Sequence, residues 1–124
     1  RILMMHIGGY PGRYDFKAYQ LIEAHRPDIF VCGHSHILKV VNDKPRNMLV
    51  LNPGAAGISG FHQVRTALRF RIDEGRIYDM EVCEWEKSIN RNENNPATLN
   101  ALYLNVSTRS HYLPLVATAS VWFF

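Results

Sequence analysis

Two short runs of mainly apolar residues early in the chain each end in histidine. Residues 2–5 are all apolar and are followed by His6 and a stretch rich in glycine and proline. Residues 28–32 form the second run, which ends in a Gly-His-Ser-His sequence at residues 33–36. Short apolar runs that stop at turn residues are typical of buried strands. We therefore predict two strands that each place histidine at the carboxyl end.

The segment between these strands has the periodicity of a helix. Apolar residues recur at helical spacing over residues 16–24, and Asp15 directly before them is a favourable N-cap. Pro27 ends the helix, because the residue before a proline disfavours helical dihedral angles. A strand, a helix and a strand predict a crossover between two buried parallel strands, and therefore an α/β fold. Both strands then carry their histidines to the sheet edge where open α/β sheets place ligand sites.

From residue 37 onward the pattern changes to that of antiparallel strands. Residues 37–41 and 48–51 flank a segment rich in turn-forming residues, which predicts a β-hairpin. Residues 64–72 alternate between mainly apolar and mainly basic positions, so one face of this strand is expected to pack on the core. Acidic residues on the next strand favour a neutralised solvent face over a basic stripe for nucleic acid.

The turn after that strand predicts how the last hairpin pairs. Residues 73–75 read Asp-Glu-Gly and suit a three-residue loop with glycine in the left-handed position. In this register Phe70 pairs with Tyr78. Arg69 pairs with Asp79, so that opposite charges meet across the hairpin. We therefore predict a loop of three residues and this pairing.

Composition narrows the class of protein without defining a function. The chain has 124 residues, of which 47% are apolar and 20% are charged, as in one ordinary globular domain. Its net charge of +3 favours anionic ligands but is too small to define a nucleic-acid binder. The two cysteines form no Cys-x-x-Cys pair and no signal peptide is visible, so we expect reduced thiols and a cytoplasmic location. The apolar run at residues 111–124 is shorter than the ~20 residues of a membrane-spanning helix.

The chain is expected to contain one domain followed by a tail. From about residue 86 the sequence becomes rich in asparagine, which is typical of a linker. We therefore assign residues 1–88 to the domain, and residues 89–124 to a linker and tail without an assigned role. Because the chain begins with Arg1 and enters an apolar run at once, we interpret it as a fragment of a longer domain.

Three of the six histidines are candidate metal ligands. His6, His34 and His36 follow the two predicted strands, and neutral imidazole is a common ligand for zinc, manganese and iron. The alternative is that they are hydrogen-bonded loop histidines. A pair of divalent ions also needs carboxylates to offset the repulsion between the cations, and no Asp-x-His sequence occurs in the chain. The histidines alone therefore predict part of a hydrolytic metal centre.

Taken as a set, these residues resemble a known family. The chain looks like the carboxyl-terminal half of a calcineurin-like metallophosphoesterase. The likeness rests on His6 after a strand, on the sequence that contains His34 and His36, and on the Asn-Pro-Gly sequence at residues 52–54. The small prokaryotic phosphodiesterases of that superfamily are the most similar, and the likeness covers residues 1–88. It implies part of a sandwich of two β-sheets flanked by helices, whose amino-terminal half is missing here.

The resemblance also implies a role for each of these residues. His6 and His34 would bind one metal ion of a pair, and His36 would bind the other. Asn52 and Gly54 would line the substrate loop, although a tight turn is an equal interpretation of that sequence. The expected ions are manganese, with zinc, iron, nickel or magnesium as alternatives. No catalytic acid or base is assigned, because the amino-terminal motifs that supply carboxylates are absent from this sequence.

The implied function is metal-dependent hydrolysis of phosphodiesters through a metal-bridging hydroxide, carried out by the complete protein. The expected partner is a small phosphodiester or a nucleotide and not a membrane, while nucleic acid and assembly into a homo-oligomer stay open. One alternative is a catalytically inactive scaffold of the same fold that binds other proteins. Another is a basic nucleic-acid-binding module, which would bind DNA or RNA without added metal.

Overall fold

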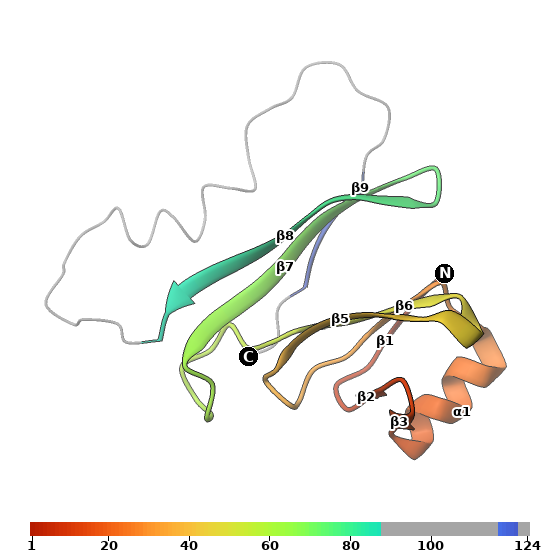
Figure 1. The fold of residues 1–124 in the computed structure, drawn as a ribbon, viewed down its shortest axis with the longest axis horizontal. Helices are drawn as coiled ribbons and strands as arrows, with labels where there is room; N and C mark the ends of the chain where they lie inside the picture. The colour runs from red at the N-terminus through yellow and green to blue at the C-terminus, as the bar shows by residue number, and fades with distance from the viewer. Residues whose placement is uncertain (88–116, 122–124) are drawn as a thin grey trace, which may run out of the picture.

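The computed structural model describes residues 1–87 and 117–121, which form an α/β sandwich (Figure 1). Within these residues, one sheet has four strands in the spatial order β1 (Ile2–Met4), β4 (Ile29–Val31), β6 (Met48–Pro53) and β5 (Leu38–Asp43). The other sheet has the order β8 (Arg76–Glu86), β7 (Val64–Asp73) and β9 (Ala117–Val121). The remaining elements are β2 (Gly9–Tyr10), β3 (Arg13–Tyr14), α1 (Phe16–His25) and the short 3-10 helix η1 (Lys44–Arg46).

The predicted crossover is confirmed, because β1 and β4 are parallel and α1 connects them. Asp15 caps the helix, since its side chain accepts hydrogen bonds from the backbone N–H groups of Lys17 at 2.9 Å and Ala18 at 3.4 Å. The helix ends where Arg26 adopts a left-handed conformation and donates its backbone N–H to Ile22 O. The predicted hairpin is also confirmed, as β5 and β6 are antiparallel neighbours.

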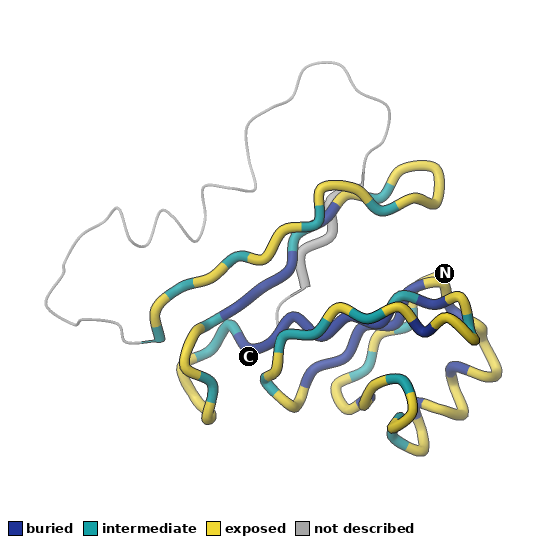
Figure 2. Tube along the Cα trace, viewed as in Figure 1, coloured by how far each residue is buried: buried dark blue, intermediate teal, exposed yellow. Residues whose placement is uncertain are grey.

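Two apolar layers hold the sandwich together. On one face of the first sheet, α1 contributes to a cluster made of Ala18, Ile22, Phe30, Cys32, Met48 and Val50. On the other face, the second sheet packs against the first through Ile29, Val31, Leu51, Leu68 and Phe70. All three residues of β4 are buried, because both faces of this strand are covered. Figure 2 shows the buried positions concentrated in the central strands of the first sheet and in β7.

The turn between β7 and β8 differs from the predicted one. Asp73 pairs with Arg76, so the loop contains only Glu74 and Gly75. Both residues have positive φ angles, 46° and 76°, as in the type I′ turns whose twist matches that of the flanking strands. The predicted three-residue loop is therefore wrong, because Glu74 adopts a left-handed conformation that its residue type does not favour.

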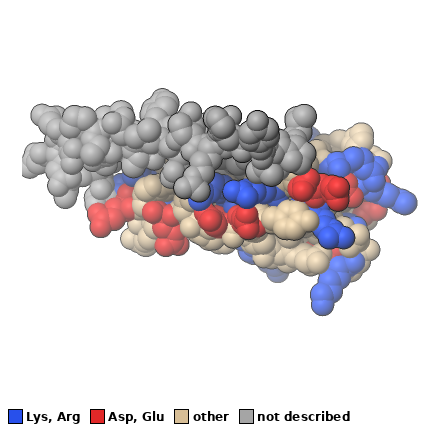
Figure 3. Space-filling model, turned by 90° about the horizontal axis from the view of Figure 1, so that it is seen from above, with Lys and Arg blue, Asp and Glu red and all other residues tan. Residues whose placement is uncertain are grey.

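The register of this hairpin is shifted accordingly. Tyr78 pairs with Arg71 and not with Phe70, and an irregularity further along the strands shifts the pairing again. Arg69 consequently lies opposite Glu81, with which it forms a salt bridge. Opposite charges still meet across the hairpin, as expected of a neutralised solvent face, and Figure 3 shows acidic and basic side chains next to one another on the visible face.

A hydrogen-bonded network ties the β2–β3 ribbon to the first sheet. The Tyr14 hydroxyl donates to Asp43 Oδ2 at 2.7 Å, and the Arg46 guanidinium donates to the same oxygen at 3.2 Å. Arg46 also bonds Glu23 on α1 at 2.9 Å. Burial, followed by the hydrogen bond to Asp43, raises the pKa of Tyr14 well above its usual range. The ribbon is therefore fixed against the end of β5.

Strand β9 lies within the range that was assigned to a linker and tail. It pairs with β7 in antiparallel orientation, with Val121 opposite Leu68 and Ala117 opposite Ile72. The rest of that range falls outside the described residues, so its division from the domain stays a prediction. Among the described residues, no helix is long and apolar enough to cross a membrane.

Candidate metal centre

His6 and His34 lie side by side at the carboxyl ends of β1 and β4. Backbone pairing continues past the two strands, because Met5 N donates to Val31 O and Gly33 N donates to His6 O. This register brings His6 Nε2 to 3.3 Å from His34 Nδ1, with the two exposed rings in an edge-to-face arrangement. The sequence-based expectation that these strands deliver neighbouring imidazoles is therefore met.

The distance between these two nitrogens is compatible with both of them binding the same metal ion. Facing imidazole nitrogens either share a hydrogen or direct both lone pairs at one cation. Two nitrogens bound tetrahedrally to one ion at the usual metal–nitrogen length lie about 3.4 Å apart. The observed 3.3 Å between His6 Nε2 and His34 Nδ1 agrees with that value. The chemistry of this pair therefore suits manganese, zinc, iron or nickel better than magnesium, which prefers oxygen ligands.

The loop that carries His34 and His36 has an unusual backbone. Both histidines have positive φ angles, 67° and 57°, in the region that L-residues avoid. Each such residue costs on the order of 1–2 kcal/mol. Strain of this kind persists only where the surrounding structure fixes the conformation, and it is concentrated at functional sites.

Asn52, at the end of β6, provides that fixation. Its side-chain Nδ2 donates to Gly33 O at 3.1 Å and to Ser35 Oγ at 3.0 Å, while its Oδ1 accepts from Gly54 N at 3.0 Å. The Ser35 hydroxyl in turn accepts from Ile37 N at 3.3 Å. Because both Nδ2 hydrogens are used within the protein, Asn52 acts here as the clamp of the histidine loop. Its assignment to the substrate loop stays a prediction.

Gly54 is required by the way β6 turns towards β7. It has a φ angle of 78°, and a Cβ at this position would lie 1.9 Å from Thr66 Oγ1. That hydroxyl donates to Pro53 O at 2.8 Å, and Thr66 N donates to Ala55 O. Asn52 and Pro53 are therefore the last residues of β6, and the buried Gly54 follows them with a positive φ angle. The interpretation of this sequence as a tight turn and a substrate contact by Gly54 both stay predictions.

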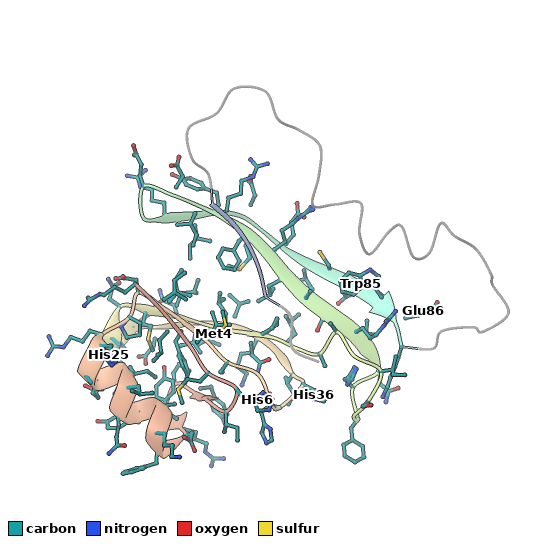
Figure 4. All side chains as sticks on the ribbon, turned by 180° about the vertical axis from the view of Figure 1, so that it is seen from behind. Met4, His6, His25, His36, Trp85 and Glu86 are labelled. Carbon is teal, nitrogen blue, oxygen red and sulfur yellow. The ribbon has the colours of Figure 1, made fainter. Side chains whose placement is uncertain are left out.

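His36 makes its ring contact with a histidine that was not predicted as a ligand. The rings of His36 and His62 lie edge to face with centroids 5.3 Å apart. Figure 4 shows His36 at the same end of the first sheet as His6. Within residues 1–87 and 117–121, however, no three histidine, cysteine, aspartate or glutamate side chains lie close enough to hold one ion. The structure thus joins His6 to His34, and the division of the three histidines between two ions stays a prediction.

Hydrogen bonding fixes the tautomer of His62. Its Nε2 lies 2.8 Å from Gly57 O, and because a carbonyl only accepts, Nε2 carries the hydrogen. Its Nδ1 is buried without a hydrogen-bond partner in the described structure. Gly60 passes directly over both rings, since a Cβ there would lie 2.4 Å from His36 Nδ1 and 3.2 Å from His62 Nδ1. The sequence offers little signal for this contact, because residues 57–63 show no periodicity.

The described residues therefore form an α/β sandwich with paired imidazoles at the carboxyl ends of β1 and β4. Residues 1–75 match the calcineurin-like phosphoesterase superfamily domain. The chain belongs to this superfamily, whose members generally bind divalent metal ions, and the predicted partial metallophosphoesterase fold is confirmed.

Comparison with characterised proteins adds little to this assignment. No curated protein matches the chain. Among solved structures, Vacuolar Protein Sorting 29 from Cryptosporidium parvum is similar, with 21% sequence identity and a TM-score of 0.35. That match covers 66% of this chain and 50% of the other, so this chain spans about half the length of that protein.

Proposed function

We propose that the complete protein hydrolyses phosphodiesters at a centre of two divalent ions, and that this chain supplies its histidine side. The observation that carries the proposal is the 3.3 Å separation of His6 Nε2 and His34 Nδ1 at the ends of two parallel strands. His6 and His34 would hold one ion, expected to be manganese, and His36 would hold the other. When bound, such ions supply positive charge at the phosphoryl oxygens and acidify a water molecule.

This chain orients the ligands but does not balance the charge of the ions. Imidazole is neutral when it binds a metal, so two divalent ions held by histidines alone would repel one another strongly. Among the described residues no three histidine, cysteine, aspartate or glutamate side chains gather to hold an ion, and we propose that carboxylates elsewhere in the complete protein balance the charge. We therefore expect the chain by itself to bind a single ion weakly and to have little activity.

The edge of the first sheet supports a further segment of the domain beside β1. Ile2 and Met4 are more than half exposed, although Leu3 and Met5, which alternate with them along the chain, pack on the core. Since β1 is an edge strand of the described sheet, its second side is open to another strand. Carboxylates carried there would reach the same sheet edge as His6. The expected substrate is a small phosphodiester or a nucleotide in the cytoplasm.

Manganese titration of the chain tests the ligand assignment. We expect paramagnetic broadening of the NMR signals of the His6 and His34 rings, and loss of the weak site in His34→Ala. His25→Ala is the matched control, because His25 is an exposed histidine in the last turn of α1. Unchanged binding in His34→Ala, or two tight manganese sites in the isolated chain, would contradict the proposal. An inactive scaffold of the same fold would show no manganese binding at these rings.

The activity itself is tested on the complete protein. We expect it to cleave a generic aryl phosphodiester with manganese, to lose activity to a chelator, and to lose several orders of magnitude in kcat/KM in His34→Ala. A basic nucleic-acid-binding module would instead bind DNA or RNA without metal, with affinity that falls steeply as salt increases.

A further inference from the structure

A cavity of about 350 Å³ lies next to His34, between the β2–β3 ribbon and the first sheet. The loop after β1, the histidine loop and strand β5 contribute its walls, so it opens beside the candidate metal ligands. Cavities of this size are in the range that binds small organic molecules. His34 and Asn52 belong to its lining, but no role proposed so far concerns the other residues of its walls.

Part of the cavity wall is formed by apolar residues that are exposed to solvent. Ile7, Tyr10 and Ile37 line it and remain 48%, 38% and 61% exposed, respectively. Val50 and the backbone of Gly8 and Gly9 complete this side. Apolar side chains gathered around a cavity favour a ligand with an apolar or aromatic group over a sugar or a polyol.

Positive charge lies on the same walls. The Lys39 ammonium sits 3.9 Å from the centre of the Tyr10 ring, where it holds the ring in place by a cation–π contact. Arg13 also lines the cavity. Asp15 is the acidic residue of the lining, and its carboxylate is engaged as the N-cap of α1. The cavity therefore combines an aromatic platform with a cationic surround.

We infer that this cavity binds the aromatic group of a phosphoester, as in a nucleotide, with the ring against Tyr10 and the phosphate towards His34. Aromatic rings stack favourably on tyrosine, and Lys39 and Arg13 attract the anionic end of the same molecule. The phosphate end of this assignment rests on the proposed function. Aliphatic phosphoesters lack the ring and would forfeit the apolar contacts.

NMR titrations of the chain with phenyl phosphate and methyl phosphate, each with and without manganese, test this inference. We expect phenyl phosphate to shift the backbone amides of Tyr10, Gly33 and Lys39, and to bind about tenfold more tightly than methyl phosphate. Equal affinities for the two esters, or shifts confined to other parts of the chain, would overturn the inference.

Two variants and one control test the cavity residues directly. Lys39→Met keeps most of the side-chain length but removes the charge, and should weaken phenyl phosphate binding about threefold to tenfold. Tyr10→Ala should remove the preference for phenyl over methyl phosphate. Lys44→Met should leave both affinities unchanged, because Lys44 is an exposed lysine in η1, away from the cavity lining. Unchanged binding in both Lys39→Met and Tyr10→Ala would contradict the assignment.

The manganese arms separate this inference from the proposed function. Binding that depends on Tyr10 and Lys39 but not on manganese or His34 would support the aromatic site and contradict the metal-linked phosphate site. Manganese-dependent binding that is equal for methyl and phenyl phosphate would support the metal-linked phosphate site and contradict the aromatic site. In that second case the proposed function stands, and the aromatic assignment of the cavity fails.

Discussion

Asn52→Ala is the substitution that most directly tests how the histidine loop is held. The Asn52 side chain is 7% exposed and makes three hydrogen bonds, to Gly33 O, Ser35 Oγ and Gly54 N. Alanine removes all three at once. The Ser35 hydroxyl is exposed and regains a partner from water, and the buried Gly33 O keeps its hydrogen bond from Ser35 N at 2.8 Å. The buried Gly54 N is therefore the group that loses its partner.

The expected cost follows from the buried Gly54 N. A buried donor or acceptor left without a partner costs about 1–3 kcal/mol. The unpaired Gly54 N therefore gives a loss of about 1–3 kcal/mol in the free energy of unfolding. Because Asn52 also opposes the strain of the left-handed histidines, the rings of His34 and His36 should lose their fixed positions.

Urea unfolding monitored by circular dichroism measures the first effect, and the NMR signals of the histidine rings measure the second. Asn42→Ala is the matched control, since Asn42 is an exposed asparagine on the neighbouring strand β5, and it should change stability by less than about 0.5 kcal/mol. A loss below about 1 kcal/mol in Asn52→Ala, with unshifted ring signals, would refute the idea that this amide clamps the loop.

Three further predictions concern a glycine, a tyrosine and the thiols. Gly60→Ala should lower the free energy of unfolding by about 1–3 kcal/mol, because Gly60 has a φ angle of 114° and the new Cβ would meet His36 Nδ1. Urea unfolding measures this loss, and NMR should show shifted signals of the His36 ring. Burial, followed by the hydrogen bond to Asp43, raises the pKa of Tyr14, so the free energy of unfolding should fall as the pH rises above about 10, where the tyrosine of the unfolded chain ionises. In urea unfolding, Tyr14→Phe should make this pH dependence flatter. Burial also raises the pKa of the Cys32 thiol, so a disulfide reagent should modify Cys83 quickly and Cys32 only at the rate of unfolding.

The elements that the sequence predicted correctly are those with a local physical signal. Asp15 caps α1 and Pro27 follows it, so the ends of the helix can be read from single residues. The apolar runs of β1 and β4 are short and continuous, as buried parallel strands require. Once those strands are parallel, the proximity of His6 and His34 follows from their positions at the strand ends.

The features that escaped prediction depend on contacts between distant segments. A two-residue and a three-residue turn compete closely after β7, and the left-handed conformation of Glu74 is settled by strand twist rather than by residue type. The contact of His62 with His36 arises in a loop without periodicity. The pairing of β9 with β7 joins segments about 50 residues apart, which no local pattern can indicate.

The two halves of the proposed centre would make different physical contributions. In this chain, Asn52 and the backbone pairing beyond β1 and β4 hold the backbone that carries the imidazoles before any ion binds, so part of the entropic cost of organising these ligands is met in folding. What the histidines lack is negative charge. A segment beside β1 that adds carboxylates would therefore raise metal affinity mainly through charge, and adding it should increase the number and tightness of the sites without moving His6 and His34.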